Sequence, residues 1–240
     1  MKLSNELLIS CSIACLALHY VTGCSRDFDN VFDEQTDSST PQREEGLVAF
    51  YPFNGNANDE SGNGNNGTVS GAILAEDRFG NANNAYSFDG ANVINTGIML
   101  PNIFSLSLWY NAATNQKENA GLASTYSFNR FYGFYYSLSG NASAGWIRFD
   151  NNGLNATESV ANRWVNLVMI SDGSNIEVYL DSELKLKFTG TTSHSDNLIL
   201  GDSRFNGRYF TGRIDDVRIY NRALTSEEIQ TIYHENGWAN

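Results

Sequence analysis

The stretch that decides the fold is Gly212-Arg213-Ile214-Asp215-Asp216-Val217-Arg218-Ile219-Tyr220-Asn221-Arg222-Ala223-Leu224, near the end of the 240-residue chain. Val217 and Ile219 recur with the period of two that is typical of a β-strand with one buried face. Ile214 is out of phase with them, which predicts a β-bulge at Asp215-Asp216. Two adjacent carboxylates at a kinked strand need a charged partner, and a bound cation is the first candidate.

A short helix is predicted directly after this strand. Thr225-Ser226-Glu227-Glu228 has the pattern of a capping box, and Leu224 and Ile229 stand where a hydrophobic staple would place them. Ile229 and Ile232 begin one apolar helix face, and Gly237 is the predicted stop.

The rest of the domain consists of short alternating segments between glycine- and asparagine-rich turns, about a dozen strands in all. Residues 104–108 alternate cleanly, with Phe104 facing inward, whereas residues 163–170 are apolar on both faces and predict a central, buried strand. Pro52 cannot donate to a ladder, so the first strand lies or ends at an edge. The predicted fold class is all-β, a two-sheet antiparallel jelly-roll sandwich with one short C-terminal helix.

The N-terminus has the pattern of an export signal. Leu7 to Leu18 form an apolar core too short to span a membrane as a mature helix, and Val21-Thr22-Gly23-Cys24 resembles the bacterial lipoprotein box. In that family the signal is cut before the cysteine, whose thiol is then lipidated. Residues 1–23 are therefore predicted to be a signal peptide, and residues 24–45 a lipidated cysteine and disordered acidic tether. The alternative is that Cys24 is an ordinary cysteine.

The expected location is the outer membrane or cell surface. The formal net charge of −12 argues against nucleic acid or an anionic membrane surface as a partner, so membrane contact would be through the lipid anchor on Cys24 only.

The domain at residues 46–240 carries three motifs in order. They are Gly46 to Asp59 followed by Ser61-Gly62-Asn63-Gly64, then Ala85 to Gly90, then the opening stretch. Together they resemble the laminin-G-like domains of the concanavalin A-like lectin/glucanase superfamily. The resemblance implies a jelly roll whose first and last strands are neighbours, often with a structural calcium at that junction. It leaves function open, because this fold serves lectins, adhesins and enzymes alike.

A Ca²⁺ site is the cofactor that the resemblance implies, with Asp59 and Asp215 as its carboxylates. The remaining ligands would be backbone carbonyls around Asn56, Gly62 and Asn63. Calcium takes six to eight oxygens, and a glycine- and asparagine-rich loop can wrap around it. The alternative is that Asp59 caps a turn and that Asp215 pairs with Arg213 or Arg218.

Catalytic chemistry is not expected. A resemblance to the catalytic glucanases of this fold would include an E-x-D-x-x-E motif, and the sequence contains none. Glu177, Asp181 and Glu183 share one strand face, but they run into a predicted turn, which favours a solvated face. An atypical glycanase that uses these acids remains an alternative.

Two polar-aromatic segments are candidates for ligand binding, because aromatic faces and guanidinium forks suit sugars. Their residues are Tyr126, Phe128, Arg130 and Tyr132 in the first segment and Arg204, Asn206, Arg208 and Tyr209 in the second. Core aromatics and solvated arginines are the alternative. The sequence thus predicts a surface-anchored binding module for a glycan, with a surface protein as the alternative partner.

Overall fold

The computed structural model describes residues 45–117, 120–127, 130–138, 145–149, 152–154, 161–202 and 207–238, with the backbone alone for 126–138, 145–149 and 152–154. These segments belong to one compact unit, Ser39–Asn240. The predicted signal peptide, Cys24 and most of the tether lie outside the described residues.

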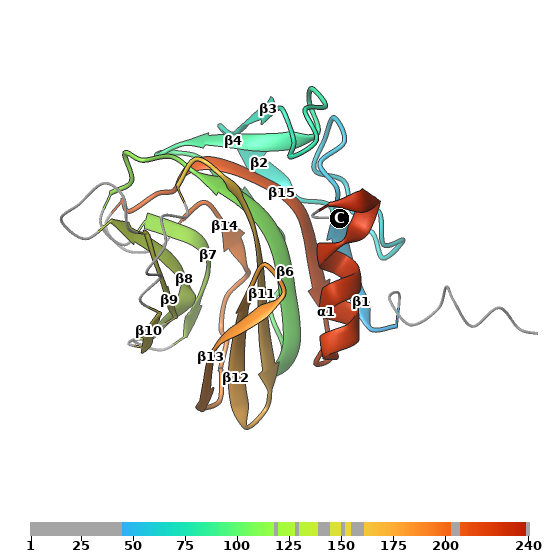
Figure 1. Cartoon of the computed structure of the whole chain (residues 1–240), viewed down its shortest axis with the longest axis vertical. Coiled ribbons are helices and arrows are strands. Elements are labelled where there is room, and N and C mark those ends of the chain that lie inside the picture. The colour runs from blue at the N-terminus through green and yellow to red at the C-terminus, as the bar shows by residue number, and fades with distance from the viewer. Residues whose placement is uncertain are drawn as a thin grey trace, which may run out of the picture. The chain divides into compact units, whose positions relative to one another are not determined.

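Two antiparallel sheets face each other in this unit, one of eight strands and one of seven (Figure 1). The larger has the order β13-β12-β11-β6-β15-β4-β3, with β1 paired to β15, and the smaller the order β10-β9-β8-β7-β14-β5-β2. The larger sheet comprises β1 (Leu47–Tyr51), β3 (Ile73–Ala75), β4 (Ala85–Asp89), β6 (Ile103–Ala112), β11 (Trp164–Asp172), β12 (Asn175–Leu180), β13 (Glu183–Thr189) and β15 (Thr211–Tyr220). The smaller comprises β2 (Thr68–Ser70), β5 (Val93–Asn95), β7 (Ala120–Ser127), β8 (Arg130–Leu138), β9 (Gly145–Phe149), β10 (Asn152–Leu154) and β14 (Ile199–Leu200). The predicted two-sheet sandwich is confirmed.

The opening stretch forms β15, which pairs with β6 along one side and with β4 and then β1 along the other. Its register with β6 shifts between Asp215 and Arg218, and Asp216 has a φ of 45°. Ile214 and Val217 both face the core between the sheets because the bulge inserts an extra residue between them. The predicted bulge is confirmed.

β1 pairs with β15 alone, so the first and last strands are neighbours and β1 ends at an edge. The predicted edge position of the strand before Pro52 is confirmed, since a residue without an N–H does no harm there.

β11 is central, between β12 and β6, and each of its faces is buried for a different reason. Val165 and Leu167 pack in the core between the sheets, and Val168 and Ile170 pack in a second cluster on the outer face of the large sheet. That second cluster also contains Tyr179, Tyr220, Leu224, Ile229 and Ile232. The helix α1 (Ser226–Tyr233) thus covers part of the outer face (Figure 1), which explains the apolar residues on both faces of β11.

The predicted capping box is present, with the Thr225 side chain accepting from the Glu228 N–H. The helix ends at Tyr233, earlier than the expected stop at Gly237, and continues as a 3₁₀ turn, Glu235–Gly237. Asn236 has a φ of 58°, in the left-handed region, so the regular helical geometry ends there. No helix in the described part of the chain is long and apolar enough to cross a membrane.

Candidate functional site

Asp59 holds the long polar loop after β1 in place. Its Oδ1 accepts the backbone N–H groups of Phe50 and Ser61, both at 2.9 Å, and its Oδ2 accepts that of Asn65 at 2.9 Å. Burial raises the pKa of this carboxyl, but the hydrogen bonds from Phe50, Ser61 and Asn65 outweigh it and lower the pKa below its usual value. Asp59 therefore caps a turn, which was the alternative to a metal ligand.

Amide side chains complete the anchoring of this loop to β1. Asn63 Nδ2 donates to the carbonyl of Leu47 at 2.9 Å, and Asn65 Nδ2 donates to that of Val48 at 2.9 Å. Asn56 Oδ1 accepts the N–H of Asn58 at 2.7 Å. Gly62, another expected ligand, lies in the left-handed region with a φ of 86°.

Asp215 has a different partner from Asp59. Its Oδ2 lies 2.8 Å from Nη1 of Arg78, and the same Nη1 lies 2.6 Å from Oδ2 of Asp216. Arg213 and Arg218, the arginines that the sequence suggested, bond elsewhere, to the Glu76 carbonyl and to Glu235. The guanidinium of Arg78 is the cation that the two adjacent carboxylates require.

These contacts do not fit a calcium shared by Asp59 and Asp215. The oxygens of Asp59 accept three backbone N–H groups, and Asp215 accepts the Asp216 N–H at 2.8 Å besides its ion pair with Arg78. Within the described residues, no three His, Cys, Asp or Glu side chains gather closely enough to hold a metal ion. Calcium stays a prediction, and the described contacts give it no shared pair of carboxylates.

Arg78 is buried, with 1% of its side chain exposed. Its guanidinium carbon lies 4.5 Å from the ring centre of Phe79 and 4.6 Å from that of Trp109, so two aromatic faces offset part of its desolvation. Nε and Nη2 have no hydrogen-bond partner among the described residues. Burial first, and then the charge of Asp216, raises the pKa of Asp215 to about 8, against the opposing effect of Arg78.

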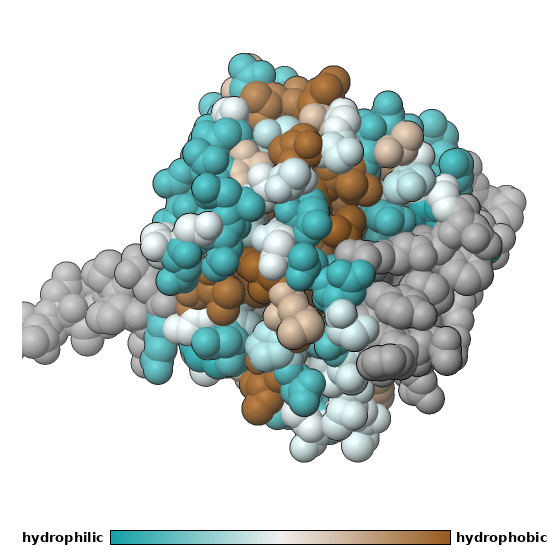
Figure 2. Space-filling model, turned by 180° about the vertical axis from the view of Figure 1, so that it is seen from behind, coloured by the Kyte–Doolittle hydropathy of each residue, from teal (hydrophilic) through white to brown (hydrophobic). Residues whose placement is uncertain are grey.

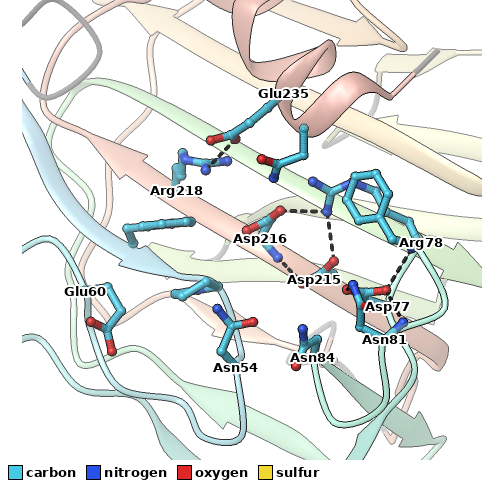
Figure 3. A pocket seen from close by; sticks show the side chains of 14 residues that line it. Asn54, Glu60, Asp77, Arg78, Asn81, Asn84, Asp215, Asp216, Arg218 and Glu235 are labelled. Carbon is cyan, nitrogen blue, oxygen red and sulfur yellow. Dashed lines mark hydrogen bonds and ion pairs between the residues drawn. The ribbon is translucent and has the colours of Figure 1, made fainter. Parts of the chain in front are cut away.

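A pocket of about 770 Å³ opens over this cluster, beside the 3₁₀ turn that follows α1 (Figure 3). We call it the Arg78 pocket. Its lining residues are Phe50, Pro52, Asn54, Glu60, Asp77, Arg78, Phe79, Asn81, Asn84, Asp215, Asp216, Arg218, Glu235 and Asn236. They come from β1 and the loop after it, the loop before β4, the bulge of β15, and the C-terminal turn.

The floor of the Arg78 pocket is a set of paired charges. Besides the Arg78 cluster, Arg218 pairs with Glu235 at 2.6 Å and lies 4.0 Å from the ring centre of Phe50. Asp77 Oδ1 accepts the N–H groups of Phe79 at 2.8 Å and Asn81 at 2.9 Å. The charged groups of the floor are thus held by contacts within the protein, although Arg78 Nε and Nη2 and Arg218 Nη1 have no hydrogen-bond partner among the described residues.

The rim of the Arg78 pocket has the opposite character. The side chains of Asn54, Glu60, Asn84 and Asn236 make no hydrogen bond or ion pair with any described residue. Phe79 is 40% exposed beside them. Three amides, one carboxylate and one aromatic ring are therefore available to a bound molecule.

Of the polar-aromatic residues singled out from the sequence, Tyr126, Arg130 and Tyr132 belong to β7 and β8 of the smaller sheet. Tyr126 pairs with Phe131 and Ser127 with Arg130 at the β7–β8 hairpin, and Tyr132 is opposite Thr125. Tyr209 bridges Gly121, five residues before Tyr126 on the same strand, so the two segments are roughly 17 Å apart along β7. The backbone places both segments in one sheet and at different ends of it.

The structure describes only one of the remaining residues of this prediction. Phe128, Arg204 and Asn206 lie outside the described residues, and Arg208 is half-buried, with its carbonyl accepting the Gly121 N–H at 2.8 Å. The glycan role of these two segments stays a prediction.

The acids considered for catalysis are engaged in ion pairs. Glu177 pairs with Lys187 across β12 and β13 at 2.5 Å and accepts the Tyr179 hydroxyl at 2.7 Å. Asp181 pairs with Arg163, and Glu183 with Lys185. Paired carboxylates at an exposed edge agree with the solvated face that was favoured over a catalytic pair.

Arg78 was missed by the sequence reasoning. The signal lies in Asp77-Arg78-Phe79-Gly80-Asn81, where an arginine stands among turn residues just before a strand motif. Only the fold shows that this turn meets the bulge of β15.

Apolar side chains also reach the surface. The exposed large ones among the described residues are Ile73, Phe79, Met99, Ile103 and Leu184. Figure 2 shows hydrophobic residues in a broken band among hydrophilic ones on the face behind Figure 1. Of the five exposed residues named above, Phe79 lines the Arg78 pocket.

Comparisons with known proteins agree with the fold. The sequence model of the laminin-G family described as "Concanavalin A-like lectin/glucanases superfamily" matches residues 79–230. Among curated proteins, none matches the chain significantly.

Three solved structures illustrate the similarity of fold. Domain 4 of AbnA, an extracellular arabinanase from Geobacillus stearothermophilus in complex with arabinotriose, has a TM-score of 0.63 at 22% identity, over 78% of this chain and 98% of that one. The receptor binding domain of botulinum neurotoxin D has a TM-score of 0.58 at 16% identity, over 80% of this chain and 53% of that one. A Trypanosoma rangeli sialidase mutant has a TM-score of 0.57 at 16% identity, over 78% of this chain and 32% of that one.

Proposed function

Because the chain belongs to the concanavalin A-like lectin/glucanase superfamily, we propose that it is a carbohydrate-binding module whose saccharide occupies the Arg78 pocket. The membership alone does not assign this role, since the fold also carries enzymes. The proposal rests on one observation, the contrast between the paired floor of the pocket and its unpaired rim.

Saccharides present hydroxyl groups that both donate and accept hydrogen bonds, together with apolar C–H faces. The amides of Asn54, Asn84 and Asn236 each offer a donor and an acceptor at the rim. The half-exposed ring of Phe79 offers a flat surface for a C–H face. A pocket of about 770 Å³ is within the range of small-molecule sites.

A fixed floor favours this use of the pocket. Arg78, Asp215 and Asp216 are held by short ion pairs, so they lose little freedom when a ligand binds. The arabinotriose in the AbnA domain complex belongs to that protein, and it supports a saccharide here as an analogy of fold.

The test is a glycan array followed by calorimetric titration of the best ligand. We expect Asn54→Ala and Asn84→Ala each to weaken binding on the order of tenfold, which corresponds to about one or two hydrogen bonds. Glu183→Gln is the control, because Glu183 is exposed on β13, the fourth strand from β15 in the same sheet. A glycan that binds the folded chain unchanged in both rim variants would move the site elsewhere.

The proposal includes the location and the chemistry of the module. The lipoprotein-like segment that ends at Cys24 supports a lipid-anchored module at the cell surface. The ion pairs of Glu177, Asp181 and Glu183 support binding without hydrolysis. Release of reducing sugar from a polysaccharide panel, abolished by Glu177→Gln, would instead identify a glycanase.

A further inference from the structure

The Arg78 pocket combines a rim that suits sugar hydroxyls with a strong excess of negative charge. Its lining carboxylates are those of Glu60, Asp77, Asp215, Asp216 and Glu235, and its guanidinium groups are those of Arg78 and Arg218. Five carboxyl groups thus face two guanidinium groups.

Both positive charges are already used. Arg78 pairs with Asp215 and Asp216 while it stacks against Phe79 and Trp109, and Arg218 pairs with Glu235. The guanidinium N–H groups that have no partner among the described residues, Nε and Nη2 of Arg78 and Nη1 of Arg218, are buried, so an acidic sugar would reach them only if the floor rearranged. Uronic and sialic acids therefore do not suit the pocket.

Glu60 is the negative charge that remains available. Its side chain is exposed and makes no ion pair or hydrogen bond with the described residues, whereas its backbone N–H is fixed to the Phe50 carbonyl at 2.8 Å. Figure 3 shows Glu60 across the pocket from Arg78. The rim thus carries an exposed carboxylate with no partner among the described residues, on a backbone that is hydrogen-bonded to β1.

We propose that the pocket selects a saccharide with a free amino group, whose ammonium is received by Glu60 while its hydroxyls contact the rim amides. This inference rests on the proposed function and names its ligand class. An ammonium about 4 Å from a carboxylate is attracted weakly in water and more strongly at a partly desolvated site, enough for a preference of roughly tenfold. The attraction is large enough to discriminate between ligands that share one sugar backbone.

The experiment compares two probes that differ only at nitrogen, the tetramer of β-1,4-linked glucosamine and its fully N-acetylated form. Calorimetric titration of the full chain at about pH 6, where such amines are protonated, is expected to show roughly tenfold tighter binding of the amine form. The preference should shrink as salt is raised, because an exposed ion pair is screened. In Glu60→Gln it should fall to about twofold or less, and Glu183→Gln should keep it.

The outcomes separate this inference from the function it rests on. Equal affinity for the two tetramers, or tighter binding of an oligomer of uronic acid, overturns the amine preference and leaves a saccharide site. A preference that persists in Glu60→Gln overturns the role of Glu60. Silence of both tetramers, with a neutral glycan bound in an Asn54-dependent way, overturns the amine preference alone. Silence of every saccharide overturns the proposed function as well.

Discussion

At the scale of single residues, Asp59 shows how one carboxylate can hold a polar loop by accepting several backbone hydrogen bonds. Three backbone N–H groups converge on it from Phe50, Ser61 and Asn65. Charge-assisted hydrogen bonds of this kind are stronger than neutral ones. Asp59 therefore links β1 to the loop through these hydrogen bonds.

We expect Asp59→Ala to lower the free energy of unfolding by about 2–4 kcal/mol, because three N–H groups lose their acceptor. Urea denaturation of the wild type and the variant, each with and without EDTA, checks this. The loss should be the same in both buffers, and EDTA should leave the wild type unchanged. Destabilisation of the wild type by EDTA that disappears in Asp59→Ala would restore calcium to this site.

Asp215 gives the protein an unusual dependence of stability on pH. Its pKa in the folded state is about 8, against an ordinary value of 3.8, because burial and then the charge of Asp216 disfavour its ionised form. Between these two values the folded state holds a proton that the unfolded state has released. The contribution of Asp215 to stability is complete below about pH 4 and is lost as the pH rises through about 8, by on the order of 1 kcal/mol per pH unit.

Melting temperatures of the wild type and Asp215→Asn at pH 5, 7 and 9 test this expectation. The wild type should lose stability from the lowest to the highest of these values, and the variant, which cannot ionise at this position, should lose less. Arg78 still has Asp216 as its partner in the variant, so the chain should fold. Parallel pH profiles would show that Asp215 is charged throughout.

The bulge could be predicted from sequence and its partner could not. The phase slip between Ile214 and Val217 is a local signal, and both residues do face the core. Arg78 lies 137 positions before Asp215 in the chain, so no spacing rule connects them. The sequence suggested Arg213 and Arg218 as partners because they are close to Asp215 in the chain.

At the scale of elements, the short helix α1 depends on its first turn. Glu228 closes the capping box by accepting the Thr225 N–H at 2.7 Å, and it also pairs with Arg222 at 2.6 Å. Burial of Ile229 and Ile232 against the large sheet supplies the rest of its stability. Because α1 leads into the turn that carries Glu235 and Asn236, its first turn bears indirectly on one wall of the Arg78 pocket.

Thr225→Ala should lower the free energy of unfolding by about 1 kcal/mol, since the Glu228 N–H loses its side-chain acceptor. Thr231→Ala is the matched control on the same helix. Thr231 is exposed and its hydroxyl bonds only the Glu227 carbonyl of its own helix, so its loss should be close to neutral. Denaturant unfolding of both variants measures the difference, and equal effects would contradict the role of the cap.

The helix and several strands could be predicted from the sequence because the residues that specify each of them are close together in the chain. The capping box, the alternation in β6 and the apolar faces of β11 each lie within about ten residues, the range over which periodicity works. The α-helix ends a few residues before the expected stop at Gly237, because the chain continues from Tyr233 into the 3₁₀ turn Glu235–Gly237. After this 3₁₀ turn, Trp238 packs against Phe79 and Trp109. Helix propensity does not report such tertiary contacts, so it does not predict where a helix tightens into a 3₁₀ turn.

At the scale of the whole molecule, the Arg78 pocket is assembled from four segments that are far apart in the chain. The sequence favoured aromatic residues that cluster locally, and those described by the structure within β7 and β8 lie in the smaller sheet. Sites that form on the outer face of a sheet need the order of the strands, which is non-local. The pairing of β15 with both β1 and β4 brings the two polar loops together.

The lipoprotein-like leader leads to a prediction for the chain as a whole. If Cys24 carries the anchor, Cys24→Ser removes the acyl chains and with them the membrane affinity, about 0.8 kcal/mol for each buried CH₂. The residues proposed to bind saccharide lie from Asn54 onward, beyond the acidic tether, so the variant should keep the affinity for glycan that the proposal expects. Fractionation of expressing cells is expected to move the protein from the detergent phase of the membrane fraction to the aqueous phase.

The control is Cys15→Ser, a change inside the apolar core of the leader that leaves the lipoprotein-like box intact. This variant should remain in the detergent phase, because the signal is removed before the mature protein is anchored. Retention of Cys24→Ser in the membrane would show that contact with the membrane is made by another part of the chain. Since the acidic chain has little electrostatic attraction to an anionic surface, a lipid anchor is the simplest physical means of holding this module at a membrane.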